Sequence, residues 1–292
     1  MDNASRGERQ APLRTVPVEL LATGFGFVEA PSFDRQGVLH FSEVRPGRVH
    51  RLDAAGNVSL FHQAASDWCN GTAFHRDGRL FLCDVGAATI VALAPDGRAE
   101  VVADRCTDDG ARLRGPNDLV FDRGGALYFT DPQGSSLETP IGAVYRLTPD
   151  GRVQRVATGL AFPNGLALTE DETALRVAET RTRRIHRYPI GPDGQVGPGE
   201  LFCQLPEDGG GPDGMALAAT GQLFVCHIGA GCIDVVEPDG RLQRRIATGG
   251  DRPSNCAFRG TSLYVTVTHD GVGAIHRLDV GVAGQPLFGE RD

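Results

Sequence analysis

Residues 115–132 read Gly115-Pro-Asn-Asp-Leu-Val-Phe-Asp-Arg-Gly-Gly-Ala-Leu-Tyr-Phe-Thr-Asp-Pro132. A polar corner precedes a short apolar run, Leu119 to Phe121, and after a glycine turn a second apolar run ends on Asp131. Two short runs rich in β-branched and aromatic residues, joined by such a turn, predict a β-hairpin. The later turn Pro149-Asp-Gly151 predicts a second hairpin, so the unit contains four short strands.

This unit recurs six times along the chain. The polar residues that precede the first strand of each copy are Glu29, Asn70, Asn117, Asn164, Asp213 and Asn255. Their successive spacings are 41, 47, 47, 49 and 42 residues. A period in this range with four strands per copy is typical of a β-propeller blade. The sequence therefore predicts an all-β fold, a six-bladed β-propeller with four antiparallel strands per blade and almost no helix.

The repeats also define the domain. Blades bury their faces only against neighbouring blades, so residues 15–292 are predicted to form one domain, after a disordered tail of residues 1–14. The stretch from Val16 to Gly24 ends in Ala-Thr-Gly, as do the last strands of two copies at Gly159 and Gly249. This predicts that the N-terminal strand completes the sixth blade and closes the ring. The segment 285–288 resembles 200–202 and is a competitor for that place.

Composition narrows the class of protein. The formal net charge of −8 argues against a nucleic-acid partner, because phosphate binding needs a basic surface. Residues 1–14 lack the apolar core of a signal peptide, and no apolar run is long enough to span a membrane. The seven cysteines form no Cys-x-x-Cys pair, which predicts buried, reduced thiols in a cytoplasmic protein. The oligomeric state stays open.

The first strand of every propeller blade lines the central channel, so the six residues at the repeat position are expected to converge on the axis. All six carry a side-chain oxygen. Such oxygens, with two carboxylates among them, suit Ca²⁺ or, less tightly, Mg²⁺ or Mn²⁺, and no Cys/His set with zinc spacing competes. The alternative is that these residues form turns, because three of them precede a glycine and Asn-Gly and Asp-Gly are common turn pairs.

A second polar position falls at the end of the second strand of each copy. Acids there are expected to accept hydrogen bonds from backbone N–H groups of neighbouring loops, as we predict for Glu43, Asp84 and Glu179. His227 shares this position, and His269 lies two residues beyond its strand. Each is either a loop histidine or a proton carrier in a pocket. Trp68, near Asn70, is a candidate for the pocket wall or for simple blade packing.

Four short motifs at blade spacing resemble those of the senescence marker protein/gluconolactonase/luciferin-regenerating enzyme family. They are Glu29-Ala-Pro31, Pro116-Asn-Asp118, Pro163-Asn-Gly165 and Pro212-Asp-Gly214. The resemblance implies a six-bladed propeller with one axial divalent metal ion and the hydrolysis of a sugar lactone. Ca²⁺ is the first expectation, with Mg²⁺, Mn²⁺ or Zn²⁺ as alternatives. The implied ligands are Glu29, Asn164 and Asp213, with Asn117 as a fourth ligand or a substrate contact.

The same resemblance implies roles in catalysis. The metal would polarise the lactone carbonyl, and Asp213 would be both ligand and general base, with His227 as the fallback base. The expected substrate contacts are Asn117, Asp118, Arg114, His227, Trp68 and His269. Some members carry an arginine two residues before the Asn of the third blade. Here Gly115 and Pro116 displace the nearest arginine to position 114, which leaves a preference for sugar acids open.

Two other functions remain as alternatives. The Pro-Asn-Asp form is similar to that of phosphotriesterases such as diisopropyl fluorophosphatase. A non-catalytic binding propeller that Ca²⁺ only stabilises would also fit, because propellers host many functions.

Overall fold

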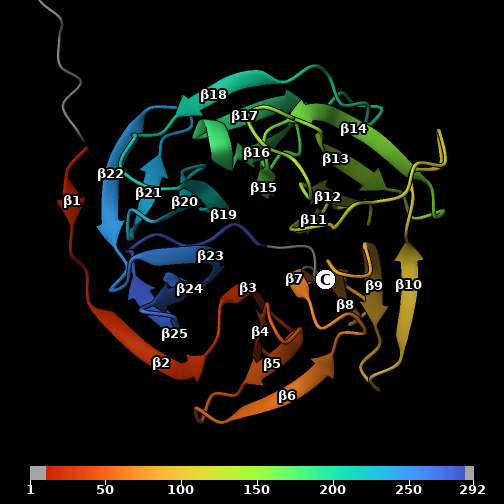
Figure 1. The fold of residues 1–292 in the computed structure, drawn as a ribbon. Helices are drawn as coiled ribbons and strands as arrows, with labels where there is room; N and C mark the ends of the chain where they lie inside the picture. The colour runs from red at the N-terminus through yellow and green to blue at the C-terminus, as the bar shows by residue number, and fades with distance from the viewer. Residues whose placement is uncertain (1–10, 287–292) are drawn as a thin grey trace, which may run out of the picture.

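The structure, a computed structural model, describes residues 11–286 and contains six sheets arranged around a central axis (Figure 1). Each sheet has four antiparallel strands, and one of the six carries an additional parallel edge strand. In five of the blades the four antiparallel strands follow one another in chain order from the axis outwards, and in the sixth the outermost strand comes from the N-terminal part of the chain. The predicted six-bladed propeller is therefore confirmed.

Every blade begins with a strand beside the axis. Blade 1 contains β3 (Val28–Phe33), β4 (Leu39–Glu43), β5 (Arg48–Leu52) and β6 (Val58–Gln63). Blade 2 contains β7 (Cys69–Phe74), β8 (Leu80–Asp84), β9 (Thr89–Leu93) and β10 (Ala99–Ala103). Blade 3 contains β11 (Leu119–Phe121), β12 (Leu127–Asp131), β13 (Gly142–Leu147) and β14 (Val153–Leu160).

The second half of the chain repeats this order. Blade 4 contains β15 (Pro163–Leu168), β16 (Ala174–Glu179), β17 (Arg184–Pro189) and β18 (Glu200–Gln204). Blade 5 contains β19 (Gly211–Leu217), β20 (Leu223–Ile228), β21 (Cys232–Val236) and β22 (Leu242–Ala247). Blade 6 contains β23 (Arg252–Arg259), β24 (Ser262–His269) and β25 (Val272–Asp279).

The ring is closed by the N-terminal strand. β2 (Val18–Phe25) pairs antiparallel with β25 and supplies the fourth strand of blade 6, as predicted. β1 (Leu13–Arg14) pairs in parallel with β22, so regular structure starts before the predicted boundary at residue 15. The C-terminal segment takes another path, because the Gln285 N–H donates to the Leu217 carbonyl at 2.9 Å. The predicted competition for the outer position of blade 6 is therefore not seen for the described part of this segment. Leu287 and Phe288 lie outside the described residues.

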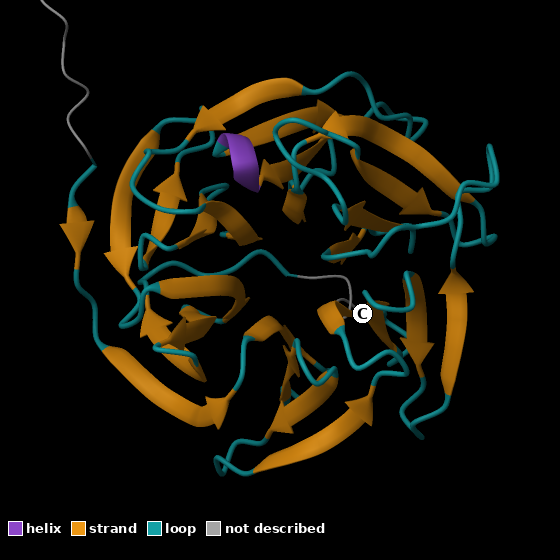
Figure 2. Cartoon of the chain, in the orientation of Figure 1, coloured by secondary structure: helices purple, strands orange, loops and turns teal. Residues whose placement is uncertain are grey.

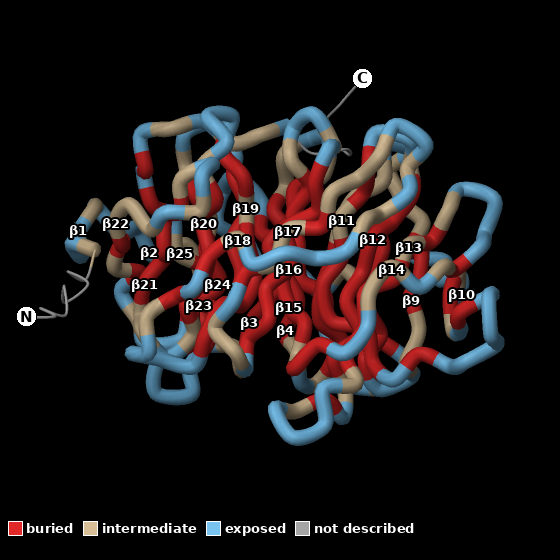
Figure 3. Tube along the Cα trace, turned by 90° about the horizontal axis from the view of Figure 1, so that it is seen from above, coloured by how far each residue is buried: buried red, intermediate tan, exposed pale blue. Residues whose placement is uncertain are grey.

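Apolar side chains hold neighbouring blades together. The buried residues form six clusters, and each cluster joins two adjacent blades around the ring. Figure 3 views the disc from the side and shows the buried strands in its middle layer and exposed turns on its two faces. Phe41, Phe129 and Phe224 are fully buried in three of these interfaces. Because every blade is held by two neighbours, closure contributes to the stability of all six.

We expect removal of residues 1–25 to lower Tm by about 10 °C or more, because blade 6 loses an eight-residue strand and the ring loses its closure. Removal of residues 1–15 deletes the two-residue β1 and keeps β2, so it is the matched control and should shift Tm far less. Calorimetric scans of both truncations measure the difference. Equal shifts in the two proteins would show that β2 does not close the ring.

Helix is almost absent from the described chain, as predicted: the one helical turn is the 3₁₀ element η1 (Thr180–Thr182) (Figure 2). None of the helices within residues 11–286 has the length and apolar character that crossing a membrane requires. All seven cysteines lie in the described part of the chain, and all are buried free thiols.

Candidate active site

The inner strands bring the six polar residues of the repeat together at one end of the axis. We call the face of the disc where inner strands begin and second strands end the entrance face. All six side chains are buried. Asn164 lies near enough to Asp213, and Asn255 to Glu29, to lower the pKa of these carboxyl groups across the boundaries between blades. We name these residues the axial ring: Glu29, Asn70, Asn117, Asn164, Asp213 and Asn255.

The glycines that follow three ring residues are not turn residues. Gly71, Gly165 and Gly214 lie inside β7, β15 and β19. A Cβ atom on Gly165 would overlap the Asp213 carbonyl oxygen and lie 2.7 Å from the Gly214 Cα atom. Each glycine therefore allows the inner strand of the next blade to approach closely. The turn interpretation of these Asn-Gly and Asp-Gly pairs is wrong, because tertiary approach rather than local conformation requires the glycine.

Three carboxylates face one another in the axial region. Burial raises the pKa of Glu29 well above its usual range, and the carboxylates of Asp213 and Asp118 raise it further. Burial and the Asp118 carboxylate likewise raise the pKa of Asp213. Burial raises the pKa of Asp118 to about 6. Within residues 11–286, none of the three is in an ion pair with a basic side chain. Such a group of buried acids is stabilised when a cation binds beside it.

The chemistry of these donors fits a hard divalent cation. Carboxylates of Glu29 and Asp213 and the amide of Asn164 offer oxygens from three blades, as the resemblance implies for Ca²⁺. Asn117 belongs to the same ring, so it can serve as a further oxygen donor. No thiol or imidazole belongs to this ring, which disfavours zinc at the axis.

Asp118 was predicted to contact the substrate, and in the structure its carboxylate interacts with neighbouring protein groups. One carboxylate oxygen accepts the Leu119 N–H at 2.9 Å, and the other lies 3.4 Å from the Asn255 amide nitrogen. Asp118 and Asn255 also line a chamber of about 110 Å³ that extends along the axis away from the entrance face. Asp118 is thus a third acid of the candidate cation site, placed beneath the ring, and its repeat position alone did not indicate this.

The raised pKa of Asp118 predicts how stability depends on pH. Because the folded protein holds this proton up to about pH 6, against an ordinary pKa of 3.8, the folded state binds more protons than the unfolded state in that window. The free energy of unfolding of the metal-free protein should therefore fall as pH rises from about 4 to about 6. Asp118→Asn should flatten this slope in denaturant titrations. Identical slopes for the two proteins would contradict the assignment.

Three predicted substrate contacts lie at the entrance face but are held by local partners. The Arg114 guanidinium donates to the Ile141 carbonyl at 2.7 Å. His269 is exposed, and its Nδ1 atom lies 3.0 Å from an Asp251 carboxylate oxygen. Trp68 is partly buried beneath the Arg45 guanidinium, 4.2 Å from the ring centroid.

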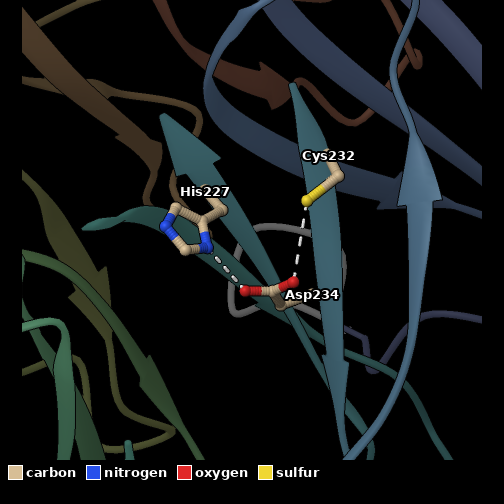
Figure 4. A group of neighbouring side chains, drawn as sticks. All are labelled: His227, Cys232 and Asp234. Atoms are coloured by element: carbon tan, nitrogen blue, oxygen red, sulfur yellow. Dashed lines mark hydrogen bonds and ion pairs between the residues drawn. The ribbon is translucent and has the colours of Figure 1, made fainter. Parts of the chain in front are cut away.

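His227 lies away from the axis, between blades 4 and 5. It is fully buried, and its Nδ1 atom lies 2.8 Å from an Asp234 carboxylate oxygen (Figure 4). Cys232 Sγ lies 3.6 Å from the other Asp234 oxygen, so three groups that can bind a metal meet here. The His227 Nε2 atom is buried and has no hydrogen-bond partner among the described residues.

This cluster fits a cation less well than the axial ring. The Arg245 guanidinium already donates to Asp234 at 2.8 Å and neutralises its charge. Burial raises the pKa of the Cys232 thiol to about 12, which disfavours the thiolate that a metal would bind. The sequence spacing did not indicate the cluster. What brings the three residues together is the β20–β21 hairpin, which pairs residue 227 with residue 232 and sets residue 234 on the same face. A predicted register for this hairpin could have revealed the cluster.

The acids at the ends of the second strands act as predicted. Glu43 accepts the Gly26 N–H at 2.9 Å, and Glu179 accepts the Ala161 N–H at 2.6 Å. Asp84 accepts the Ala87 N–H at 3.2 Å. These bonds tie the loops of the entrance face to the strands and support the axial ring from outside.

Comparison with known proteins is in accord with this geometry. The family model of the SMP-30/gluconolactonase/LRE-like region matches residues 27–269. The gluconolactonase of Zymomonas mobilis is 30% identical over 88% of this chain and 81% of its own length. The diisopropyl-fluorophosphatase of Loligo vulgaris is 30% identical over 69% of this chain and 68% of its own.

Solved structures agree. A gluconolactonase from Xanthomonas campestris superposes with a TM-score of 0.78 at 30% identity, covering 90% of this chain and 89% of that one. The calcium-binding protein regucalcin from Agrobacterium tumefaciens shares the fold, with a TM-score of 0.80 at 20% identity over 95% of this chain and 98% of that one. The axial acids, the four motifs and these matches lead to one conclusion: the chain belongs to the SMP-30/gluconolactonase/LRE-like family.

Proposed function

We propose that this protein is a metal-dependent lactonase whose cation binds at the axial ring. The observation that carries the proposal is the group of three buried carboxylates without a basic partner in the described chain, which a divalent cation would neutralise. The relatives support the reaction class, since those that match include a gluconolactonase and a pentonolactonase, each 30% identical to this chain.

Glu29, Asn164 and Asp213 would hold the cation, and Asn117 would complete the set or contact the substrate. A bound divalent ion supplies Lewis-acid polarisation of the lactone carbonyl and stabilises negative charge on its oxygen. Asp213 is the residue we assign to accept the proton of the attacking water, because its carboxylate belongs to the axial ring and lies beside Asn164. Asp118, beneath the ring, keeps a further negative charge close to the cation.

The full burial of His227 removes it as the fallback base. Its side chain has no exposed surface, and Nδ1 is engaged with Asp234. A substrate on the axis would have to displace packed residues between blades 4 and 5 to reach Nε2. We therefore assign no proton transfer to this histidine.

The proposal is tested with metal-loaded protein in a pH-stat assay against a panel of lactones, with and without chelator. We expect acid release that depends on the lactone, is lost with chelator and is restored by Ca²⁺. Diisopropyl fluorophosphate belongs in the panel, since the match to the Loligo enzyme and the Pro116-Asn-Asp118 motif favour a phosphotriesterase as the second candidate. Absence of hydrolysis throughout, with the cation bound, would leave a non-catalytic binding propeller.

A further inference from the structure

Aromatic side chains recur two residues before the axial ring. Phe27, Trp68 and Phe162 precede Glu29, Asn70 and Asn164 in three separate blades. They belong to the loops that enter the inner strands, so all three lie on the entrance face. We call them the rim aromatics. Each is only partly buried.

An arginine lies over every rim aromatic. The guanidinium carbon of Arg45 is 4.2 Å from the Trp68 ring centroid. Arg252 lies 5.1 Å from Phe27, and Arg181 lies 5.4 Å from Phe162. Stacking on an aromatic face holds a guanidinium in place while its N–H groups stay available for another acceptor. We call the arginines that make these contacts, Arg45, Arg181 and Arg252, the rim arginines.

The rim arginines make no direct ion pair in the described chain. All three are exposed, and none of them forms an ion pair with a carboxylate in the part of the chain that the structure covers. Elsewhere an exposed arginine does pair, as Arg98 does with Asp96 at 2.8 Å. The Arg252 guanidinium also interacts electrostatically with the axial Asp213 carboxylate. Three exposed guanidinium groups without a direct ion pair in the described chain thus lie at the entrance, with Glu138 near Arg181 and Asp251 near Arg252.

Backbone geometry adds an independent observation. Phe162 has a φ of 66°, in the left-handed region that bulky side chains rarely adopt. Such strain persists only where the surrounding structure imposes it, and it concentrates at ligand sites. Here it holds a rim aromatic, and with it Arg181, next to the axial ring.

We propose that the entrance binds lactones that carry an additional anionic group, a carboxylate or a phosphate, through the rim arginines. The proposal rests on the lactonase function above and names its substrate class. Three axial carboxylates would repel an anion before a cation binds, whereas with the cation bound the exposed rim arginines offer positive charge that a neutral lactone would not use. Planar guanidinium forks match the oxygens of both carboxylate and phosphate.

The test compares kcat/KM of the Ca²⁺-loaded protein for glucarolactone, phosphogluconolactone and neutral gluconolactone. We expect at least one charged lactone to be preferred about tenfold or more, with a preference that falls as salt is added. The double variant Arg45→Gln/Arg181→Gln and the single variant Arg252→Gln should each lower the ratio of charged to neutral kcat/KM several-fold. The two charged lactones distinguish carboxylate from phosphate.

Arg259→Gln is the matched control. Arg259 also lies over an aromatic ring, 5.2 Å from Phe33, but at the opposite end of the inner strand, so the substrate ratio should not change. Calorimetry with glucarate, phosphogluconate and neutral glucitol supplies a readout without turnover. Anion binding that the rim variants abolish, without any lactone hydrolysis, would support the rim and overturn the lactonase proposal. Equal kcat/KM for charged and neutral lactones, unchanged in the rim variants, would overturn the rim proposal and leave the lactonase intact.

Discussion

Asp213→Asn is expected to lower kcat for lactone hydrolysis by at least about 10²-fold, even with the cation at saturation. The substitution keeps the size of the side chain and one oxygen donor but removes the charge and the basicity. A positioned proton acceptor typically contributes about 10²–10⁴-fold to rate.

Asn70→Ala is the comparison variant, measured at the same cation saturation. Asn70 is a ring member without charge, and we assign it only to the wall of the site, so its effect on kcat should be far smaller. Near-normal turnover in metal-saturated Asp213→Asn would remove Asp213 as the base. The assignment would then pass to Asp118 or to bulk solvent, since His227 is fully buried.

Gly165→Ala is expected to weaken cation binding by at least about tenfold. The new methyl group would overlap the Asp213 carbonyl oxygen, which is backbone and cannot rotate away. Overpacking of this kind costs about 1–3 kcal/mol, and a tenfold change in affinity corresponds to about 1.4 kcal/mol. Because β19 must shift to relieve the overlap, Asp213 moves away from Glu29 and Asn164. Titration calorimetry with Ca²⁺ measures the change.

Gly124→Ala provides the matched control for this change. Gly124 lies in the turn between β11 and β12, and an added methyl group would meet only a carboxylate oxygen of Asp122, at 3.2 Å. Cation affinity should therefore stay at its normal value. Unaltered Ca²⁺ binding in Gly165→Ala would show that the close approach of β15 and β19 is not needed to shape the site.

The sequence by itself determined the architecture. A period of 41 to 49 residues with two hairpins per copy is a local property, because strand length, alternation and turn residues are set by neighbours along the chain. Once the period is known, the axial ring follows, since equivalent residues of a closed repeat must meet at its axis. The closing role of β2 was readable too, because its Ala-Thr-Gly ending matches those of other outer strands.

Tertiary structure alone decided how the blades meet. Asp118 is one residue past the ring position, and only the approach of blades 3 and 6 places it beside Asn255 as a third acid. His227 was predicted at the pocket, yet its side chain points between blades to Asp234, because the face of β20 that packs on blade 4 is set by register and blade twist. Arg45 and Arg181 lie 23 and 19 residues from their aromatic partners, and Arg252 and its partner Phe27 lie at opposite ends of the chain. Contacts of this kind depend on the packing between blades, for which a single sequence carries no periodic signal.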